Sequence, residues 1–226
     1  MATGIGDAVL DLLRPLDGEP RPLFVIAGPC VIEDEAVTLR IATRLKELTE
    51  RLGIPFTFKA SYDKANRTAL GADRGVGLDA ALPVFQRVKD EIGCPVLTDV
   101  HGPEQCKTVA GVCDILQIPA FLCRQTDLLV AAAAAGKPLN IKKGQFMAPW
   151  DMKSVVEKAT STGNRRLMVT ERGDTFGYQN LVADMRSLAI LAEFGYLANP
   201  SEAELFASDE YLDVAAGALA DAVERF

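Results

Sequence analysis

PVLTDVH, at residues 95–101, joins a short apolar run to an acidic residue and a histidine. Short runs of this kind, rich in β-branched residues, recur along the chain. They alternate with stretches of helical pattern such as Asp34–Leu52 and Leu78–Ile92. A regular alternation of strands and helices predicts a parallel sheet. The predicted strands are Leu23–Ala27, Phe56–Ala60, Pro95–Val100, Ile115–Pro119, Pro138–Lys142 and Leu167–Glu171.

Each predicted strand stops abruptly in polar or otherwise special residues. The first ends in Gly28-Pro29-Cys30, for example, and the sixth in Glu171-Arg172-Gly173. In a (β/α)8 barrel the carboxyl ends of the strands build the active site. The pattern therefore predicts an α/β protein of the TIM (β/α)8-barrel type. We expect one barrel domain over residues 1–226.

Only six strand–helix units are recognisable, so we expect an incomplete barrel. A barrel of this type takes about 250 residues. From residue 193 to residue 226 the apolar positions recur at spacings of three and four, as in Leu212, Ala215 and Leu219, which predicts a helical tail. Three explanations stay open: a natural deletion variant, a defective product that folds in part, or a different function on an inherited site.

Composition narrows the range of partners. The net charge is −7, which argues against nucleic acid or an anionic membrane as a partner, and no apolar run approaches 18 residues. The N-terminus carries no basic region typical of a secretory signal. The five cysteines are odd in number and lack CxxC spacing, which favours reduced thiols in a cytoplasmic protein: Cys30, Cys94, Cys106, Cys113 and Cys123.

Basic side chains gather at the strand ends of this acidic protein. A cluster of this kind indicates small anionic ligands with phosphates or carboxylates. Salt bridges to Asp63, Asp99 and Glu171 are the alternative use for any one of these cations. Seven at the same relative position favour anion binding instead. They are Lys59, Lys64, Arg67, Arg124, Lys142, Lys143 and Arg172.

Several long segments resemble 3-deoxy-D-manno-octulosonate 8-phosphate synthase, also called 2-dehydro-3-deoxyphosphooctonate aldolase. The resemblance extends from about residue 23 to about residue 192. The related 3-deoxy-arabino-heptulosonate-7-phosphate synthases have Lys-Pro-Arg-Thr after the second strand, whereas this chain has Lys64-Ala65-Asn66-Arg67-Thr68. The matching segments are IAGPCVIE (26–33), FKASYDKANRT (58–68), RGVGL (74–78), TDVH (98–101), LQIPAFLCRQTDLL (116–129), NIKKGQF (140–146) and TERGDTFGYQNLVADMRSL (170–188).

The resemblance implies a transferase of lipopolysaccharide precursor synthesis that condenses phosphoenolpyruvate with D-arabinose 5-phosphate. The implied catalytic residues are Lys59, Lys64, Asp99, His101 and Lys142. The implied substrate-binding residues are Ser61, Asn66, Arg67, Thr68, Gln117, Ala120, Phe121, Arg124, Gln145 and Arg172. Phe121 would separate the two ligands. Arg124 would reach the sugar phosphate of a neighbouring subunit, which implies a homotetramer.

Cys30 is the one recognisable candidate ligand for a divalent metal ion. The family has a metal-dependent branch with Cys at this position and a metal-independent branch with Asn. One thiolate does not make a metal site, and no histidine follows His101. The alternative function is a catalytically impaired relative that binds phosphoenolpyruvate or a sugar phosphate, or that pairs with a full-length subunit.

Overall fold

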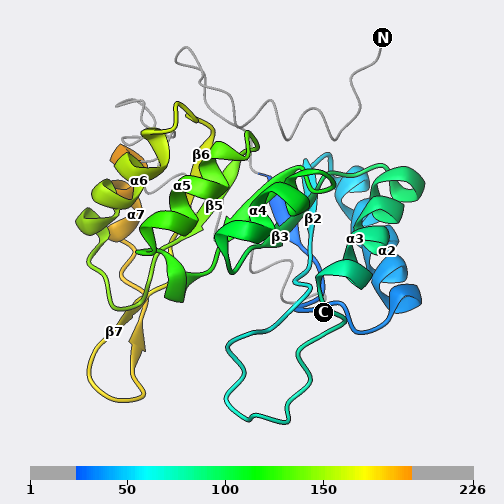
Figure 1. Cartoon of the computed structure of the whole chain (residues 1–226), viewed down its shortest axis with the longest axis horizontal. Helices are drawn as coiled ribbons and strands as arrows, with labels where there is room; N and C mark the ends of the chain where they lie inside the picture. The colour runs from blue at the N-terminus through cyan, green and yellow to red at the C-terminus, as the bar shows by residue number, and fades with distance from the viewer. Residues whose placement is uncertain (1–23, 195–226) are drawn as a thin grey trace.

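The computed structural model of the protein describes residues 24–194. Six parallel strands lie side by side in sequence order, β1 to β6, and alternate with helices (Figure 1). They form a curled half-barrel of the TIM type, which confirms the predicted fold class. Within residues 24–194, β1 and β6 each pair with one neighbour and are the edges of the sheet. The strands are β1 (Val25–Ala27), β2 (Phe56–Lys59), β3 (Val96–Asp99), β4 (Ile115–Ile118), β5 (Leu139–Lys142) and β6 (Leu167–Thr170).

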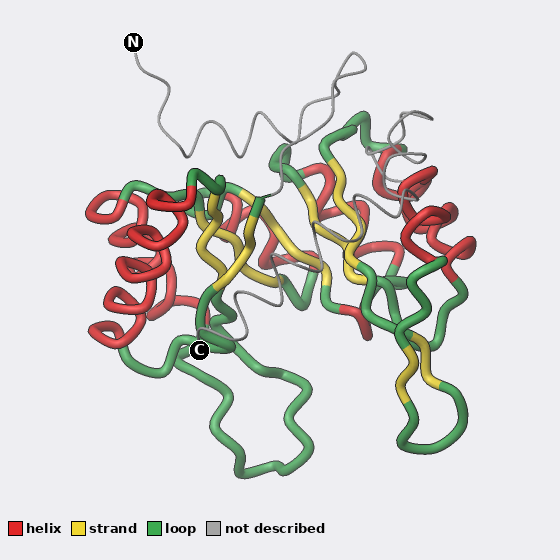
Figure 2. Tube along the Cα trace, turned by 180° about the vertical axis from the view of Figure 1, so that it is seen from behind, coloured by secondary structure: helices red, strands yellow, loops and turns green. Residues whose placement is uncertain are grey.

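The helices cover one face of this sheet. In Figure 1 helices α4 and α5 lie in front of the strands, and Figure 2 views the same strands from behind. Helix α5 packs between α4 and α6, where its small side chains Ala132 and Ala133 are buried. The helices are α2 (Glu35–Leu52), α3 (Leu78–Arg87), α4 (Pro103–Ala110), α5 (Thr126–Ala134), α6 (Met152–Thr160) and α7 (Ser187–Phe194).

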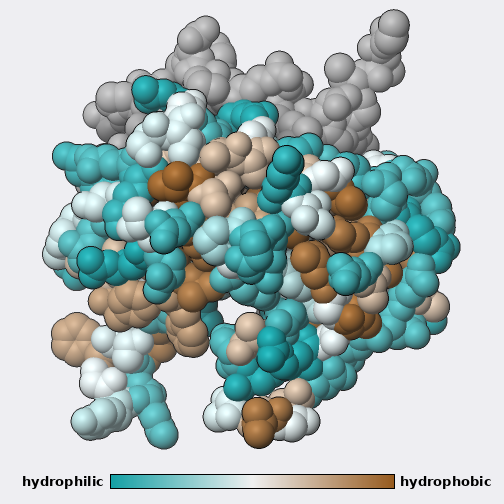
Figure 3. Space-filling view, viewed as in Figure 1, coloured by the Kyte–Doolittle hydropathy of each residue, from teal (hydrophilic) through white to brown (hydrophobic). Residues whose placement is uncertain are grey.

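Local signals explain where the longest helix begins and ends. Asp34 caps α2, because its Oδ1 accepts a hydrogen bond from the Val37 amide at 2.8 Å. Gly53 ends it in the left-handed conformation with a φ of 67°, which favours glycine. The rim of the molecule over α2 is mainly hydrophilic in the space-filling view (Figure 3). No described helix is long and apolar enough to cross a membrane.

Alternation along the strands separates two layers of side chains. On β2, Phe56 and Phe58 are fully buried in the main core, which also contains side chains of the helices. Leu97 and Ile115, on β3 and β4, belong to a second and smaller cluster. Successive strand residues point to opposite faces, so this second cluster fills the concave side of the sheet. The next residues on that side, one pleat further along, are the polar Asp99 and Gln117.

The structure adds an element that the sequence pattern does not predict. After β6, strands β7 (Asp174–Thr175) and β8 (Leu181–Val182) form a short antiparallel hairpin. Each strand pairs over two residues, which is too short to give a recognisable alternation. The predicted strands otherwise occur at their expected places, apart from differences of one or two residues at their ends. The predicted helical tail, residues 193–226, lies outside the described residues except for 193 and 194, which end α7.

Gly28 allows the ends of β1 and β2 to approach closely. A Cβ at this position would lie 2.0 Å from the backbone oxygen of Lys59. Replacing Gly28 with Ala would therefore push the two strand ends apart, because backbone atoms on both sides cannot overlap. We expect Gly28→Ala to lower the free energy of unfolding by about 1–3 kcal/mol. The measurement is urea unfolding monitored by circular dichroism.

Gly71→Ala is the matched control, because a Cβ there meets no atom within 4 Å. Its unfolding midpoint should equal that of the unmodified protein. Equal midpoints for the two variants would contradict the close approach at Gly28.

Candidate active site

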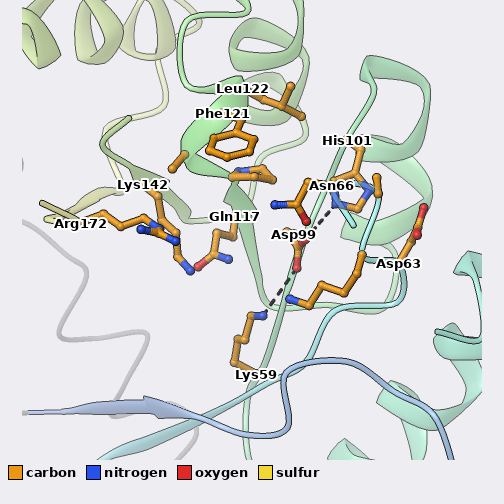
Figure 4. A pocket seen from close by; sticks show the side chains of 14 residues that line it. Lys59, Asp63, Asn66, Asp99, His101, Gln117, Phe121, Leu122, Lys142 and Arg172 are labelled. Atoms are coloured by element: carbon orange, nitrogen blue, oxygen red, sulfur yellow. Dashed lines mark hydrogen bonds and ion pairs between the residues drawn. The ribbon is translucent and has the colours of Figure 1, made fainter. Parts of the chain in front are cut away.

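A pocket of about 300 Å³ opens at the carboxyl ends of the strands (Figure 4). Ten of the residues predicted from the sequence line it, and they come from strands or loops that lie far apart in the chain. The pocket therefore lies where the strand-end pattern predicts an active site. These ten are Lys59, Lys64, Asn66, Asp99, His101, Gln117, Ala120, Phe121, Lys142 and Arg172.

Ser61 lies at the centre of a hydrogen-bond network beside the pocket. Its hydroxyl accepts from Lys59 Nζ at 2.9 Å and from Lys64 Nζ at 2.8 Å, and it donates to Asp99 Oδ1. Asp99 also lies 3.7 Å from Lys59 Nζ and, through Oδ2, 2.9 Å from His101 Nε2. One buried carboxylate thus contacts Lys59 and His101 directly and is linked to Lys64 through the Ser61 hydroxyl. Figure 4 shows the Lys59–Asp99 and Asp99–His101 contacts as dashed lines.

The electrostatics of the network favour a bound anion. Burial lowers the pKa of Lys59 to about 8, with Asp99 opposing the shift and Lys64 and Lys142 adding to it. Burial also lowers the pKa of Lys142, and Lys64 and Arg172 contribute in the same direction. Clustered cations therefore repel one another here. An anion among them would relieve this repulsion.

Asp99 remains ionised despite its burial. Burial opposes its charged form, but hydrogen bonds from His101 and Ser61 and the charge of Lys59 outweigh that effect. Together they hold the pKa of Asp99 well below its usual value. At neutral pH Asp99 is therefore a firmly negative group that faces several positive ones, whereas the other carboxylate lining the pocket, Asp63, is paired with Arg74.

Gln117 is held by residues that the sequence pattern did not single out. Asn140 Nδ2 donates to Gln117 Oε1 at 3.0 Å, and the Thr170 hydroxyl donates to Asn140 Oδ1 at 2.7 Å. Because Gln117 Oε1 is an acceptor in this chain of bonds, its Nε2 group is oriented to donate to a ligand. Asn140 and Thr170 lie on the concave face of β5 and β6, so strand alternation is the signal that identifies them.

A second group missed by sequence reasoning positions His101. Gln105 Oε1 accepts hydrogen bonds from the His101 amide at 2.8 Å, the Gly102 amide at 3.1 Å and the Tyr62 hydroxyl at 2.6 Å. The Tyr62 ring also packs on His101, with ring centroids 5.3 Å apart. Gln105 stands three residues after the N-cap of α4, at the position of a capping-box residue. The spacing of Gln105 from Gly102 is the feature of the sequence that could have identified it.

The other predicted site residues lie outside this pocket. Arg67 and Thr68 are exposed on the loop after β2, where Arg67 Nε donates to the Asp73 carbonyl at 3.0 Å. Arg124 is exposed just after the turn Ala120–Leu122. Gln145 lines a different cavity, of about 650 Å³, beside the β7–β8 hairpin. Their roles stay predictions.

Cys30 is exposed, and the described residues bring no complete metal site to it. Among residues 24–194, no group of three or more His, Cys, Asp or Glu side chains could hold a metal ion. A single thiol is too few donors for a divalent ion.

Lys143 does not lie in the pocket, although the sequence pattern predicts that it does. The strand-end pattern groups it with the pocket cations, yet its side chain is wholly buried and contacts backbone oxygens and Asp174. It follows Lys142 directly, at the end of β5, so the two side chains point in opposite directions. Only Lys142 of this pair lines the pocket.

The half-barrel and its polar pocket at the strand ends place the chain in the TIM-barrel class of α/β proteins. Comparison with known proteins makes this more specific. The chain belongs to the DAHP synthetase I family, whose sequence pattern matches residues 10–200.

Curated relatives carry the name 2-dehydro-3-deoxyphosphooctonate aldolase, which confirms the resemblance seen in the motifs. The relative from Bartonella henselae is 60% identical over 189 residues, or 84% of this chain and 68% of the relative. The relative from Rhodopseudomonas palustris is 60% identical over 176 residues, or 78% of this chain and 61% of the relative. For a Bartonella quintana relative, 58% identical, these shares are 77% and 63%. The chain thus spans between three fifths and about two thirds of the length of these relatives.

The Lys59–Asp99 contact leads to a testable titration. Because burial lowers the pKa of Lys59 to about 8 and Asp99 opposes this shift, we expect Asp99→Asn to lower the Lys59 pKa further. The measurement is the nitrogen chemical shift of the Lys59 side chain as a function of pH.

Asp63→Asn is the control, because Asp63 pairs with Arg74 and not with Lys59. In Asp63→Asn the pKa of Lys59 should therefore stay the same. A Lys59 pKa that stays the same in Asp99→Asn would contradict the electrostatic coupling.

Proposed function

We propose that the chain condenses phosphoenolpyruvate with D-arabinose 5-phosphate to give 3-deoxy-D-manno-octulosonate 8-phosphate and inorganic phosphate. The observation that carries this proposal is the pocket itself. It brings Lys59, Lys64, Lys142 and Arg172 together around the ionised carboxylate of Asp99. The names of the curated relatives support the same reaction.

The cations are arranged to hold a ligand with more than one negative group. Lys142 and Arg172 lie on one side of the pocket and Lys59 on another, with Gln117 between them (Figure 4). Phosphoenolpyruvate has a carboxylate and a phosphate, so one molecule can contact cations on both sides. Arginine suits bidentate contact with such groups, and lysine acts as a point charge.

In the proposed reaction, C3 of phosphoenolpyruvate attacks the aldehyde carbon of the aldose, and a new C–C bond forms. The aldehyde oxygen takes up a proton. Water adds at C2 and loses one proton. The bond between C2 and the phosphate oxygen then breaks, the remaining proton of the water passes to the departing phosphate, and C2 becomes a ketone. Asp99, which stays ionised, holds the ring of His101 at the pocket, where the imidazole can exchange a proton with a substrate.

The pocket would accelerate this reaction mainly by positioning. Two phosphorylated substrates repel one another in water, and fixed cations can hold them within reacting distance. The same cations would stabilise negative charge on the departing phosphate. Asn66 and the exposed ring of Phe121 lie at the edge of the pocket, where the aldose would enter.

We propose that the active form is a cytoplasmic homotetramer, as the family resemblance implies. Arg124 is exposed beside the pocket-lining turn Ala120–Leu122, which leaves it able to contact a ligand held by a neighbouring subunit.

A second candidate is a relative that binds these ligands without turnover. It is favoured by the two sheet edges that stay unpaired within residues 24–194. The two candidates make opposite predictions for phosphate release, because binding needs the cations alone whereas turnover needs a complete reaction centre.

The decisive assay measures phosphate release from phosphoenolpyruvate with arabinose 5-phosphate. We expect release only when both substrates are present. Parallel samples with added divalent metal and with chelator test whether Cys30 takes part in a metal site. Lys142→Met should lower kcat/KM for phosphoenolpyruvate about 100-fold or more, because it removes a positioned cation.

Lys153→Met is the matched control, since Lys153 is exposed on α6 and does not line the pocket. Its kcat/KM should stay within a factor of two of the unmodified protein. A folded protein that binds phosphoenolpyruvate but releases no phosphate would instead support the binding relative.

The lowered pKa of Lys59 predicts the pH dependence. Raising the pH through about 8 removes the charge of Lys59, so kcat/KM for phosphoenolpyruvate should fall above this pH. In Lys59→Arg the cation persists, because guanidinium groups stay protonated, and the decline should move to higher pH. The measurement is a pH–rate profile for both proteins. Identical alkaline limbs would assign the decline to another group.

A further inference from the structure

Lys143 is fully buried and surrounded by oxygen atoms. Its Nζ lies 2.9 Å from both the Gly173 carbonyl and Asp174 Oδ1, and 3.2 Å from the Met147 carbonyl. The Gly144 carbonyl is 3.4 Å away, and Glu171 Oε1 is 3.6 Å away. An ammonium group has three N–H donors, so this shell satisfies all of them. A buried charge persists only when it is paired and hydrogen-bonded in this way.

The five partners belong to two separate segments of chain. Gly144 and Met147 lie on the loop between β5 and α6, while Glu171, Gly173 and Asp174 follow β6. The backbone strengthens the same junction, because the Thr175 amide donates to the Gln145 carbonyl at 2.8 Å. Lys143 is thus a cation that ties the two segments together.

Both segments carry a cation of the pocket. Lys142 precedes Lys143 directly, and Arg172 lies between Glu171 and Gly173, which both contact Lys143 Nζ. Glu171 also accepts a hydrogen bond from the Arg172 amide at 2.8 Å. The backbone on both sides of Arg172 is therefore held by the Lys143 shell.

We propose that Lys143 is a positioning residue that fixes the relative placement of Lys142 and Arg172, and so sets the affinity of the pocket for phosphoenolpyruvate. The proposal rests on the proposed function. We expect Lys143 to affect the affinity for phosphoenolpyruvate alone. Asn66 and Asp99 lie on the other side of the pocket, in segments that Lys143 does not contact. A general structural role would weaken the binding of both substrates equally.

The test compares two variants that each remove a bonded lysine. Lys143→Met keeps the length of the side chain and removes its charge. Lys89→Met is the control, because Lys89 Nζ bonds to the Val112 carbonyl and to Asp114 Oδ1, both at 2.8 Å, away from the pocket. Calorimetric titration measures the Kd of each protein for phosphoenolpyruvate and, separately, for arabinose 5-phosphate.

We expect Lys143→Met to raise the Kd for phosphoenolpyruvate about tenfold or more and to change that for arabinose 5-phosphate less than twofold, because a misplaced cation pair affects the ligand that it holds. In Lys89→Met the Kd values for both substrates should stay unchanged, although this variant should lose about as much thermal stability as Lys143→Met. Unchanged phosphoenolpyruvate binding in Lys143→Met, or an equal loss for both substrates, would overturn the proposal.

Two further measurements keep the proposal open to refutation. If Lys143→Met does not fold, Asp174→Asn removes one charge of the shell and should raise the Kd for phosphoenolpyruvate in the same direction by a smaller factor. If the unmodified protein does not bind phosphoenolpyruvate, the proposed function fails. Amide hydrogen exchange at Arg172 and Gly173 then decides the positioning role: faster exchange in Lys143→Met than in Lys89→Met supports it, and equal exchange refutes it.

Discussion

Opposite orientation of successive side chains along a parallel strand is the constraint on which this structure depends. One set of strand residues packs against the helices, and the other set fills the concave face. The concave set changes character along β3 and β4. It is apolar at Leu97 and Ile115 and polar one pleat later at Asp99 and Gln117. The same alternation that builds the core thus places the chemistry at one rim of the sheet.

Asp99 makes this concentration of lysines compatible with a folded protein. Its carboxylate is almost fully buried, and it interacts with Lys59, Ser61 and His101 from β2 and the end of β3. Without a counter-charge, several cations at one rim would destabilise the chain by mutual repulsion. With Asp99 in place the repulsion is reduced but not removed, because the pKa values of Lys59 and Lys142 are still lowered, so the site still favours bound anions. Asp99 thus contributes both to the stability of the folded protein and to the affinity of the pocket for anions.

Sequence patterns predicted the strands and most of the pocket because both depend on local order. Where an apolar run ends in Thr98-Asp99, the change from apolar to polar residues marks the carboxyl end of the strand. The β7–β8 hairpin escaped prediction because its strands pair over two residues each. The roles of Lys143 and Gln105 escaped because they depend on partners that lie on other segments, as with Asp174 and Tyr62. Two adjacent lysines look identical in a sequence, and only the register at the end of β5 separates them.

The lowered pKa of Lys59 also gives this residue an unusual chemical reactivity. A lysine with a pKa of about 8 is a free amine in roughly a tenth of the molecules at pH 7, far more than an ordinary lysine. Free amines attack carbonyl carbons and form imines. Acylating reagents and reactive aldehydes would therefore modify Lys59 ahead of the many surface lysines. The contact with Asp99, which favours the protonated amine, limits this side reaction in a pocket whose proposed substrate is itself an aldehyde.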